Sequence, residues 1–222
     1  MSTETVNYHA GAELSQQVKT KLIKNTYLLL SMTLVFSGVT AGVSMAFNLP
    51  HPGLILTLVG FFGLLFAVTK FQNSGLGIVF VFALTGFMGL TLGPMLNAYL
   101  SLPNGSSLVM NAMFATAAIF LSLSAYVLTT KKDFSFMGGF LTVGILVAFL
   151  AGLGAYFFEM ESLSLVVSSM FVLLMSGLIL YETSNIINGG QTNYVMATVT
   201  LFVSIFNLFT SLLHLMGSMN EE

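Results

Sequence analysis

Residues 163–190 read LSLVVSSMFVLLMSGLILYETSNIINGG, and the stretch contains one charged residue, Glu182. The uncharged part before Glu182 approaches the roughly 20 apolar residues that an α-helix needs to cross the hydrocarbon core of a bilayer. The stretch therefore predicts a membrane-spanning helix that ends at the turn residues NGG. A carboxylate inside such a helix is costly and usually functional, so Glu182 is the first candidate for a site.

The composition of the whole chain indicates that its outer surface meets lipid. Apolar residues make up 56% of the 222 residues and charged residues only 6%, whereas soluble domains carry about 25% charged residues. The net charge of −2 and the six basic residues, all lysines, argue against nucleic acid as a partner. Because the chain has no Cys, disulfides and thiol chemistry are excluded. We expect the lipid bilayer to cover this protein.

Clusters of polar and turn residues, such as NLPHPG (48–53) and KFQNSG (70–75), divide the chain into apolar spans. The predicted fold is an all-α integral membrane protein, a seven-helix transmembrane bundle formed by a single domain over residues 27–217. A polar cytoplasmic tail (1–26) precedes this domain and a short acidic tail (218–222) follows it. The spans are predicted at 27–47, 53–69, 76–100, 108–129, 136–158, 163–187 and 194–217.

The charged residues predict the orientation of the bundle. With the N-terminus in the cytoplasm, alternating spans place every lysine on the cytoplasmic side: Lys19, Lys21, Lys24, Lys70, Lys131 and Lys132. The same alternation places four acids on the other side: Glu159, Glu161, Glu221 and Glu222. Since cytoplasmic loops of membrane proteins carry the lysine excess, we expect the N-terminus to be cytoplasmic and the C-terminus periplasmic.

Pairs of small residues four positions apart predict where helices approach closely. Three spans carry such a pair: Gly38 and Gly42, Gly89 and Gly93, and Ala148 and Gly152. This spacing lets helix backbones pack together, either within one bundle or along the seam of a dimer. The sequence leaves both possibilities open.

Glu182 lies about six residues from the end of its span, which corresponds to a depth of roughly 9 Å. A carboxylate at that depth suits a pH sensor or a cation gate; the alternative is a Glu that is hydrogen-bonded to its neighbours or reaches the membrane surface. Lys70 is predicted at a similar level and is the candidate counter-ion. The other polar candidates for this pH-sensing or ion pathway are Tyr181 and Asn185 on the same span and Ser204 and Asn207 on the last span.

No pattern typical of an intramembrane enzyme occurs in the chain. There is no H-E-x-x-H sequence, the three His residues are scattered, and Asp133 is the single aspartate. Without Cys, thiol catalysis is also excluded. We therefore expect neither an enzyme nor a bound cofactor or metal.

Several motifs occur together in the order that one known family shows. The chain resembles the Bax inhibitor-1 family in five stretches: NTYLLLSMTLVFS (25–37), TLGPMLNAY (91–99), TTKKDFSF (129–136), LYETSNIINGG (180–190) and LFVSIFNLFTSLL (201–213). The resemblance implies a seven-helix membrane bundle with the last span near its centre.

The resemblance implies one possible function through ion flow. Some relatives are pH-sensitive calcium leak channels, in which an acid on span six pairs with an aspartate on span seven and a base on span two engages the pair. Carried over, the first acid is Glu182 and the base is Lys70, with calcium as a transported ion. The position of the second acid holds Ser204, so this sequence departs from the channel pattern there.

The resemblance also implies a second function, which we favour. Some bacterial members are inner-membrane modulators of the ATP-dependent membrane protease FtsH, restrain its action on membrane proteins, and are themselves degraded. The implied partners are FtsH and its membrane-associated regulators HflK and HflC. The tail from Met1 to Asn25 is the candidate handle for the protease, since it is polar and not expected to fold alone. The pH-sensitive leak channel remains the alternative.

Overall fold

The computed structural model describes residues 2–219, with side chains from Gln16 onward, and its described part is helical without strands. It contains seven long helices, which confirms the predicted seven-helix membrane fold. Of the predicted acidic tail only residues 218 and 219 are described, so Glu221 and Glu222 lie outside. The helices are α1 (Ser2–Ala46), α2 (Leu54–Phe71), α3 (Gly75–Leu100), α4 (Gly105–Thr130), the short 3₁₀ helix η1 (Ser135–Met137), α5 (Gly138–Phe157), α6 (Glu161–Asn188) and α7 (Tyr194–Ser218).

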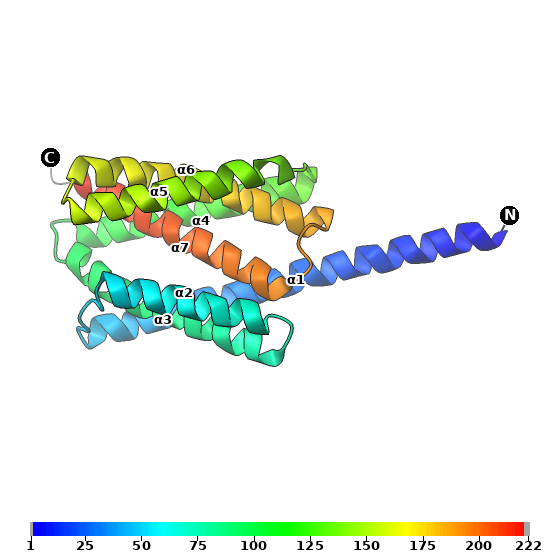
Figure 1. Cartoon of the computed structure of the whole chain (residues 1–222), viewed down its shortest axis with the longest axis horizontal. Coiled ribbons are helices and arrows are strands. Elements are labelled where there is room, and N and C mark those ends of the chain that lie inside the picture. Colours follow the sequence, from blue (N-terminus) through cyan, green and yellow to red (C-terminus); the bar gives the residue numbers. More distant parts are fainter. Residues whose placement is uncertain (1, 220–222) are drawn as a thin grey trace.

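Helix α1 projects far beyond the rest of the bundle (Figure 1). Its apolar, membrane-length part is Gln16–Ala46, and residues 2–15 extend the same helix by about 20 Å. The polar tail was not expected to fold by itself, yet its backbone is helical here. Adding turns to an existing helix avoids the unfavourable nucleation step, which explains the difference.

The two ends of the bundle differ in charge. The α2–α3, α4–α5 and α6–α7 links lie at the end from which α1 projects, and the other links lie at the opposite end (Figure 1). We call the first the lysine end, because Lys70, Lys131 and Lys132 lie there, and the second the acidic end, because Glu159 and Glu161 lie there.

Helix α7 forms the centre of the bundle. It passes between a group made of α1, α2 and α3 and a group made of α4, α5 and α6 (Figure 1). Half of its most apolar window (50%) is buried, against 6% for α2 at the edge. Its Leu201 and Phe202 pack in one core with Leu30 of α1 and Ile186 of α6. The last span is therefore central, as the family resemblance implied.

The most extensive helix contact joins α1 to α3, and small residues allow it. A Cβ added at Gly89 or Gly93 would collide with α1, at the backbone of Ser37 and the side chain of Ser44 respectively. Pro94 lacks an N–H, so it leaves the carbonyl of Leu90 without its helical donor. Ser44 Oγ donates to that carbonyl at 2.8 Å, so α1 satisfies the group that the proline frees in α3.

The other two small-residue pairs differ from each other. Ala148 is fully buried and Gly152 faces Val167 of α6, so this pair packs within the bundle. Apart from the adjoining backbone of α1, no atom of the described residues lies within 4 Å of a Cβ built at Gly38 or Gly42. Both instead line an apolar groove of about 590 Å³ between α1 and α4. Packing within the bundle therefore explains two of the three pairs.

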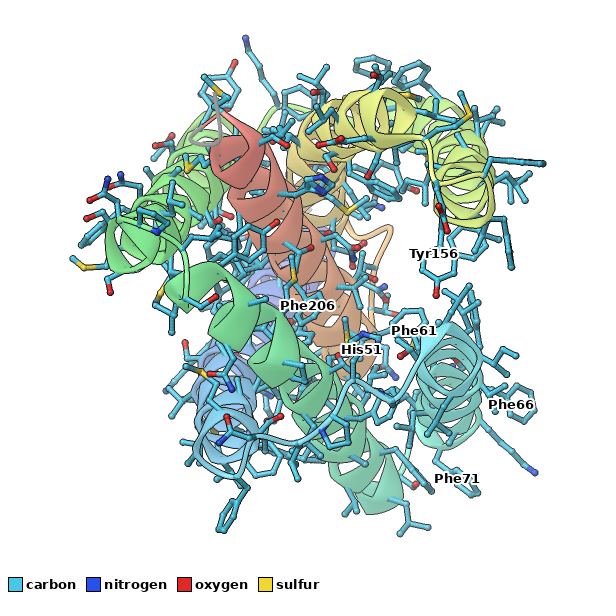
Figure 2. The ribbon with its side chains drawn as sticks, turned by 90° about the vertical axis from the view of Figure 1, so that its left-hand side faces the viewer. His51, Phe61, Phe66, Phe71, Tyr156 and Phe206 are labelled. Atoms are coloured by element: carbon cyan, nitrogen blue, oxygen red, sulfur yellow. The ribbon has the colours of Figure 1, made fainter. Side chains whose placement is uncertain are left out.

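Helix α2 is held loosely against α5. Figure 2, viewed from the acidic end, shows Tyr156 of α5 pointing toward α2. Phe61 lies on the side of α2 that faces the centre of the bundle. An edge-to-face contact joins Phe62 to Phe149, with ring centroids 6.2 Å apart. A cavity of about 670 Å³ lies between the first turn of α2 and Tyr156. Among the described residues, α2 and α5 are joined by this aromatic contact and by no side-chain hydrogen bond.

Candidate functional site

Glu182 is buried near the lysine end of α6, with 4% of its surface exposed. The loop after α6 turns back over it. Gly189 ends the helix in the left-handed region (φ +85°), and a Cβ at Gly190 would stand 3.1 Å from Asn185 Oδ1. The carbonyl of Asn185 accepts from the N–H groups of both Gly189 and Gln191, each at 3.0 Å. The two glycines therefore allow the tight return that brings Gln191 to Glu182.

Gln191 links the buried carboxylate to the α6–α7 loop. Its Nε2 donates to Glu182 Oε1 at 3.3 Å. Its Oε1 accepts from the N–H groups of Thr192 and Asn193, each at 3.0 Å. Within the described residues this amide is the hydrogen-bond partner of Glu182. The sequence analysis left residues 188–193 between two predicted spans and so missed Gln191.

The two residues after Glu182 tie α6 to other parts of the lysine end. Thr183 Oγ1 lies 3.4 Å from the hydroxyl of Tyr27 on α1. Ser184 Oγ accepts from the N–H of Phe134 at 2.8 Å and donates to the carbonyl of Lys132 at 3.3 Å, both in the α4–α5 link. The sequence YETSN therefore joins three separate segments.

Asn193 extends this network to the link between α2 and α3. Its Oδ1 caps α7 by accepting from the N–H groups of Val195 and Met196, at 2.9 and 3.2 Å. Its Nδ2 donates to the carbonyl of Gln72 at 3.1 Å and to Asn73 Oδ1 at 2.8 Å. An Asn just before an apolar run is a readable N-cap signal, which the sequence analysis did not use.

Lys70, the predicted counter-ion, is not brought to Glu182 in this structure. Its side chain is exposed in the last turn of α2, and its Nζ lies 5.7 Å from the ring centroid of Phe71. No ion pair forms among the side chains of residues 16–219. The buried carboxylate therefore has an amide partner and no described cation.

The polar candidates on α7 bond to their own helix. Ser204 is fully buried and donates to the carbonyl of Thr200 at 2.7 Å. Asn207 donates to the carbonyl of Val203 at 2.8 Å. Tyr181, the neighbour of Glu182, packs beside Gly138 in the core between α5 and α6. Of the predicted set, Asn185 contributes directly to the loop around Glu182.

Neighbouring groups shift the pKa values of two charged residues in the α4–α5 link. The N–H of Ser135 donates to Asp133 at 2.8 Å and lowers the pKa of that carboxyl. The hydroxyl of Tyr126 raises the pKa of Lys132, whose Nζ lies 5.6 Å from the centroid of that ring. Among the described residues, no three His, Asp or Glu side chains gather closely enough to hold a metal ion.

Fold and site together define a class of protein. The chain is a multi-pass membrane protein of seven helices, with a central last helix and a buried carboxylate closed by the loop that follows it. The family model described as "Inhibitor of apoptosis-promoting Bax1" matches residues 19–221. The chain belongs to this family, which confirms the predicted Bax inhibitor-1 membership.

Several bacterial relatives match along nearly the whole chain. The chain is 52% identical over 202 residues to "Modulator of FtsH protease YccA" of Escherichia coli, covering 91% of this chain and 92% of that protein. It is also 52% identical over 207 residues to an uncharacterized protein of Pseudomonas aeruginosa, covering 93% of each. An uncharacterized membrane protein of Vibrio cholerae is 45% identical over 203 residues, covering 91% of each. Of these three relatives, one is named as a modulator of a protease and one as a membrane protein.

Proposed function

We propose that this protein modulates an FtsH-type protease in the bacterial inner membrane and is not itself an enzyme. The observation that supports this proposal is the 52% identity to YccA of Escherichia coli over 91% of the chain. Identity at this level over most of the chain indicates a shared fold and supports a related function. The proposed partners are FtsH and its regulators HflK and HflC.

The proposed orientation places the lysine end in the cytoplasm and the C-terminus in the periplasm. The support is the gathering of lysines at one end of the bundle, which is typical of the cytoplasmic side. The chain has no native Cys, so single cysteines can be placed without background. A membrane-impermeant maleimide added to intact spheroplasts should label a Cys at Glu159 and spare one at Asn73. Labelling of Asn73→Cys alone would reverse the orientation.

The projecting part of α1 is the proposed contact with the protease. Residues 2–15 continue α1 beyond its membrane-length part, which begins at Gln16. The helices behind it are joined by short links, so a protease that pulls on α1 meets a compact bundle. A substrate that is extracted slowly would occupy the enzyme and restrain its action on other membrane proteins.

Co-purification tests this contact. Tagged, proteolytically inactive FtsH should retain the full-length chain from solubilised membranes and should lose most of a chain that lacks residues 2–15. A variant that lacks residues 219–222 is the matched control, because it shortens the opposite end. Equal recovery of all three proteins would mean that the contact lies outside residues 2–15. If the full-length chain were not recovered, FtsH would be excluded as its partner.

We propose a pH-sensitive cation leak as the second candidate function. The observation that favours it is Glu182, a buried carboxylate held by the amide of Gln191 without a described cation. Ionisable groups inside membrane helices mark ion pathways in many proteins. Ser204, where some relatives have a second acid, bonds to its own helix, so Glu182 would act without a carboxylate partner.

Calcium entry into liposomes tests this second candidate. Purified protein would be reconstituted, and entry would be followed from about pH 6 to pH 8 for the wild type and Glu182→Gln, a near-isosteric change that removes the titrating group. A pH-dependent flux in the wild type that loses its pH dependence in the variant would support the leak. Absence of flux in both would leave Glu182 with a structural role and the protease proposal untouched.

A further inference from the structure

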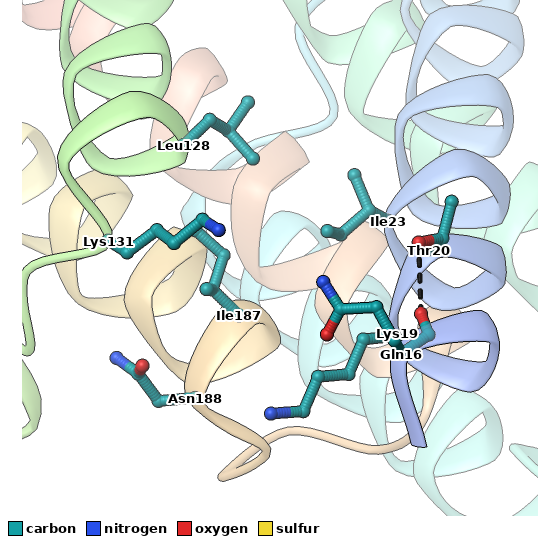
Figure 3. Close-up of a pocket in the computed structure, with 8 residues that line it drawn as sticks. All are labelled: Gln16, Lys19, Thr20, Ile23, Leu128, Lys131, Ile187 and Asn188. Atoms are coloured by element: carbon teal, nitrogen blue, oxygen red, sulfur yellow. Dashed lines mark hydrogen bonds between the residues drawn. The ribbon is translucent and has the colours of Figure 1, made fainter. Parts of the chain in front are cut away.

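A basic pocket opens at the lysine end between α1, α4 and α6. Figure 3 shows its residues, with Lys19 reaching in from α1 and Lys131 from the end of α4 on the opposite wall. The pocket has a volume of about 220 Å³. It is lined by Gln16, Lys19, Thr20, Ile23, Leu128, Lys131, Ile187 and Asn188.

Lys131, on one wall of this pocket, has an unusual backbone conformation. Lys131 caps α4 in the left-handed region (φ +54°), and its N–H bonds the carbonyl of Val127 at 2.8 Å. Glycine is the residue that normally occupies this position because it lacks a Cβ, and α6 does end at Gly189. A lysine at such a cap costs free energy relative to glycine, and its side chain lines the pocket.

The α1 lysine is also placed by its surroundings. Lys19 is half-buried, and its Cε lies 4.0 Å from where a Cβ on Gly189 would stand. Its stem therefore lies along the end of α6. The carboxyl ends of α4 and α6 both meet this pocket and carry partial negative charge, so an anion could bind here only with the help of the two lysines.

The described carboxylates nearest in the sequence to the pocket walls are engaged elsewhere. Asp133 accepts from the N–H of Ser135, and Glu182 accepts from Gln191. Among the described side chains neither pocket lysine forms an ion pair. Two ammonium groups therefore line one small cavity, an arrangement that suits an anionic group.

The rest of the lining indicates the source of that anion. Ile23, Leu128 and Ile187 give the pocket an apolar part, while its polar groups stand at the end of the membrane-length helices. We propose that this basic pocket binds the phosphate group of an anionic phospholipid, with Lys19 and Lys131 on the phosphate. The apolar residues would contact the glycerol and upper acyl region. Basic pockets between helices at the cytoplasmic face of a membrane are suited to such headgroups.

Native mass spectrometry of the purified full-length chain tests the proposal. The probes are phosphatidylglycerol, zwitterionic phosphatidylcholine, and inorganic phosphate. The test variant is Lys19→Gln with Lys131→Gln. The matched control is Lys24→Gln with Lys132→Gln, which removes equal charge from the same end but outside the pocket. Lys19→Gln alone is a second test variant that leaves the strained cap unchanged, and circular dichroism would verify that every variant is folded.

We expect the wild type and the control to retain one phosphatidylglycerol at similar lipid concentrations. The test variant should need at least about tenfold more lipid, because each lysine near an anionic headgroup contributes to binding. Lys19→Gln should fall between them. Equal weakening in the control, or equal retention of phosphatidylcholine, would overturn the proposal by showing unspecific attraction. If inorganic phosphate at equal concentration displaced the lipid, the proposal would be overturned, because the ligand would then be a soluble anion rather than a lipid.

Discussion

The lysine end of α6 and the middle of α7 use similar polar residues in opposite ways. On α6, Ser184 bonds to the α4–α5 link, and Glu182 bonds to the α6–α7 loop through Gln191. On α7, Ser204 and Asn207 donate to carbonyls of their own preceding turn. Near a loop, a polar side chain reaches backbone groups that no helix satisfies; in the middle of a helix, the nearest acceptor is usually its own backbone. Position along the span, rather than residue type, decides whether a polar residue joins segments.

Among the substitutions that test this comparison, Ser184→Ala should lower the free energy of unfolding most. The change leaves the N–H of Phe134 and the side-chain amide of Asn188, which also donates to Ser184 (3.1 Å), without this partner. Asn188 is exposed and can bond to water instead, so the cost comes from the partly buried N–H of Phe134. Leaving such a group unsatisfied costs about 1–3 kcal/mol. The free energy of unfolding in detergent micelles, followed by circular dichroism, should fall by that amount. An unchanged value would mean that the α4–α5 link is held by other contacts.

A smaller loss is expected for Asn193→Ala. The change removes the cap of α7 and its tie to the α2–α3 link. Loss of an N-cap costs about 1 kcal/mol. Thr192→Ala is the matched control, since that side chain is exposed and next in sequence. The same unfolding measurement should separate the two variants; equal stability would show that the cap contributes little within the membrane bundle.

Ser204→Ala tests the α7 half of the comparison. Ser204 is as deeply buried as Ser184, but the carbonyl of Thr200 to which it donates belongs to its own helix. Removing this hydroxyl breaks no hydrogen bond between segments, so the free energy of unfolding should change by less than about 0.5 kcal/mol. Unfolding of the Ser184 and Ser204 variants side by side gives this difference directly. A loss as large as that of Ser184→Ala would show that Ser204 has a partner outside α7.

The smallest effect should come from Asp133, and it should depend on pH. Its pKa is lowered from 3.8 by the N–H of Ser135, so the ionised carboxylate stabilises the folded link. That contribution is present above the unfolded pKa and is lost as the pH falls through the lower, folded value. The melting temperature of Asp133→Asn should lie slightly below that of the wild type at pH 6, and the difference should vanish as the pH falls below the lowered pKa of Asp133. Curves that stay parallel would exclude the carboxylate as the cause.

The fold could be predicted from the sequence because long apolar runs between polar breaks can satisfy their backbone hydrogen bonds in a bilayer by forming membrane-spanning helices. The site could be predicted in part. Glu182 stood out because one acid in an apolar run is rare, and Asn185 followed from helix spacing. Gln191 could not be found this way, because its role depends on the turn made by Gly189 and Gly190. Lys70 shared a predicted membrane level with Glu182, but level alone does not set the direction of a side chain on an edge helix.

The most direct test of the proposed function is the rate at which purified FtsH degrades a membrane-protein substrate in proteoliposomes with ATP. Co-reconstituted wild-type chain should slow that degradation several-fold, and the chain without residues 2–15 should slow it much less. A substrate that lacks a membrane span, degraded at the same rate throughout, would control for general inhibition. Membrane-substrate degradation that proceeds at the same rate with and without the wild-type chain would contradict the proposal that this protein modulates the protease.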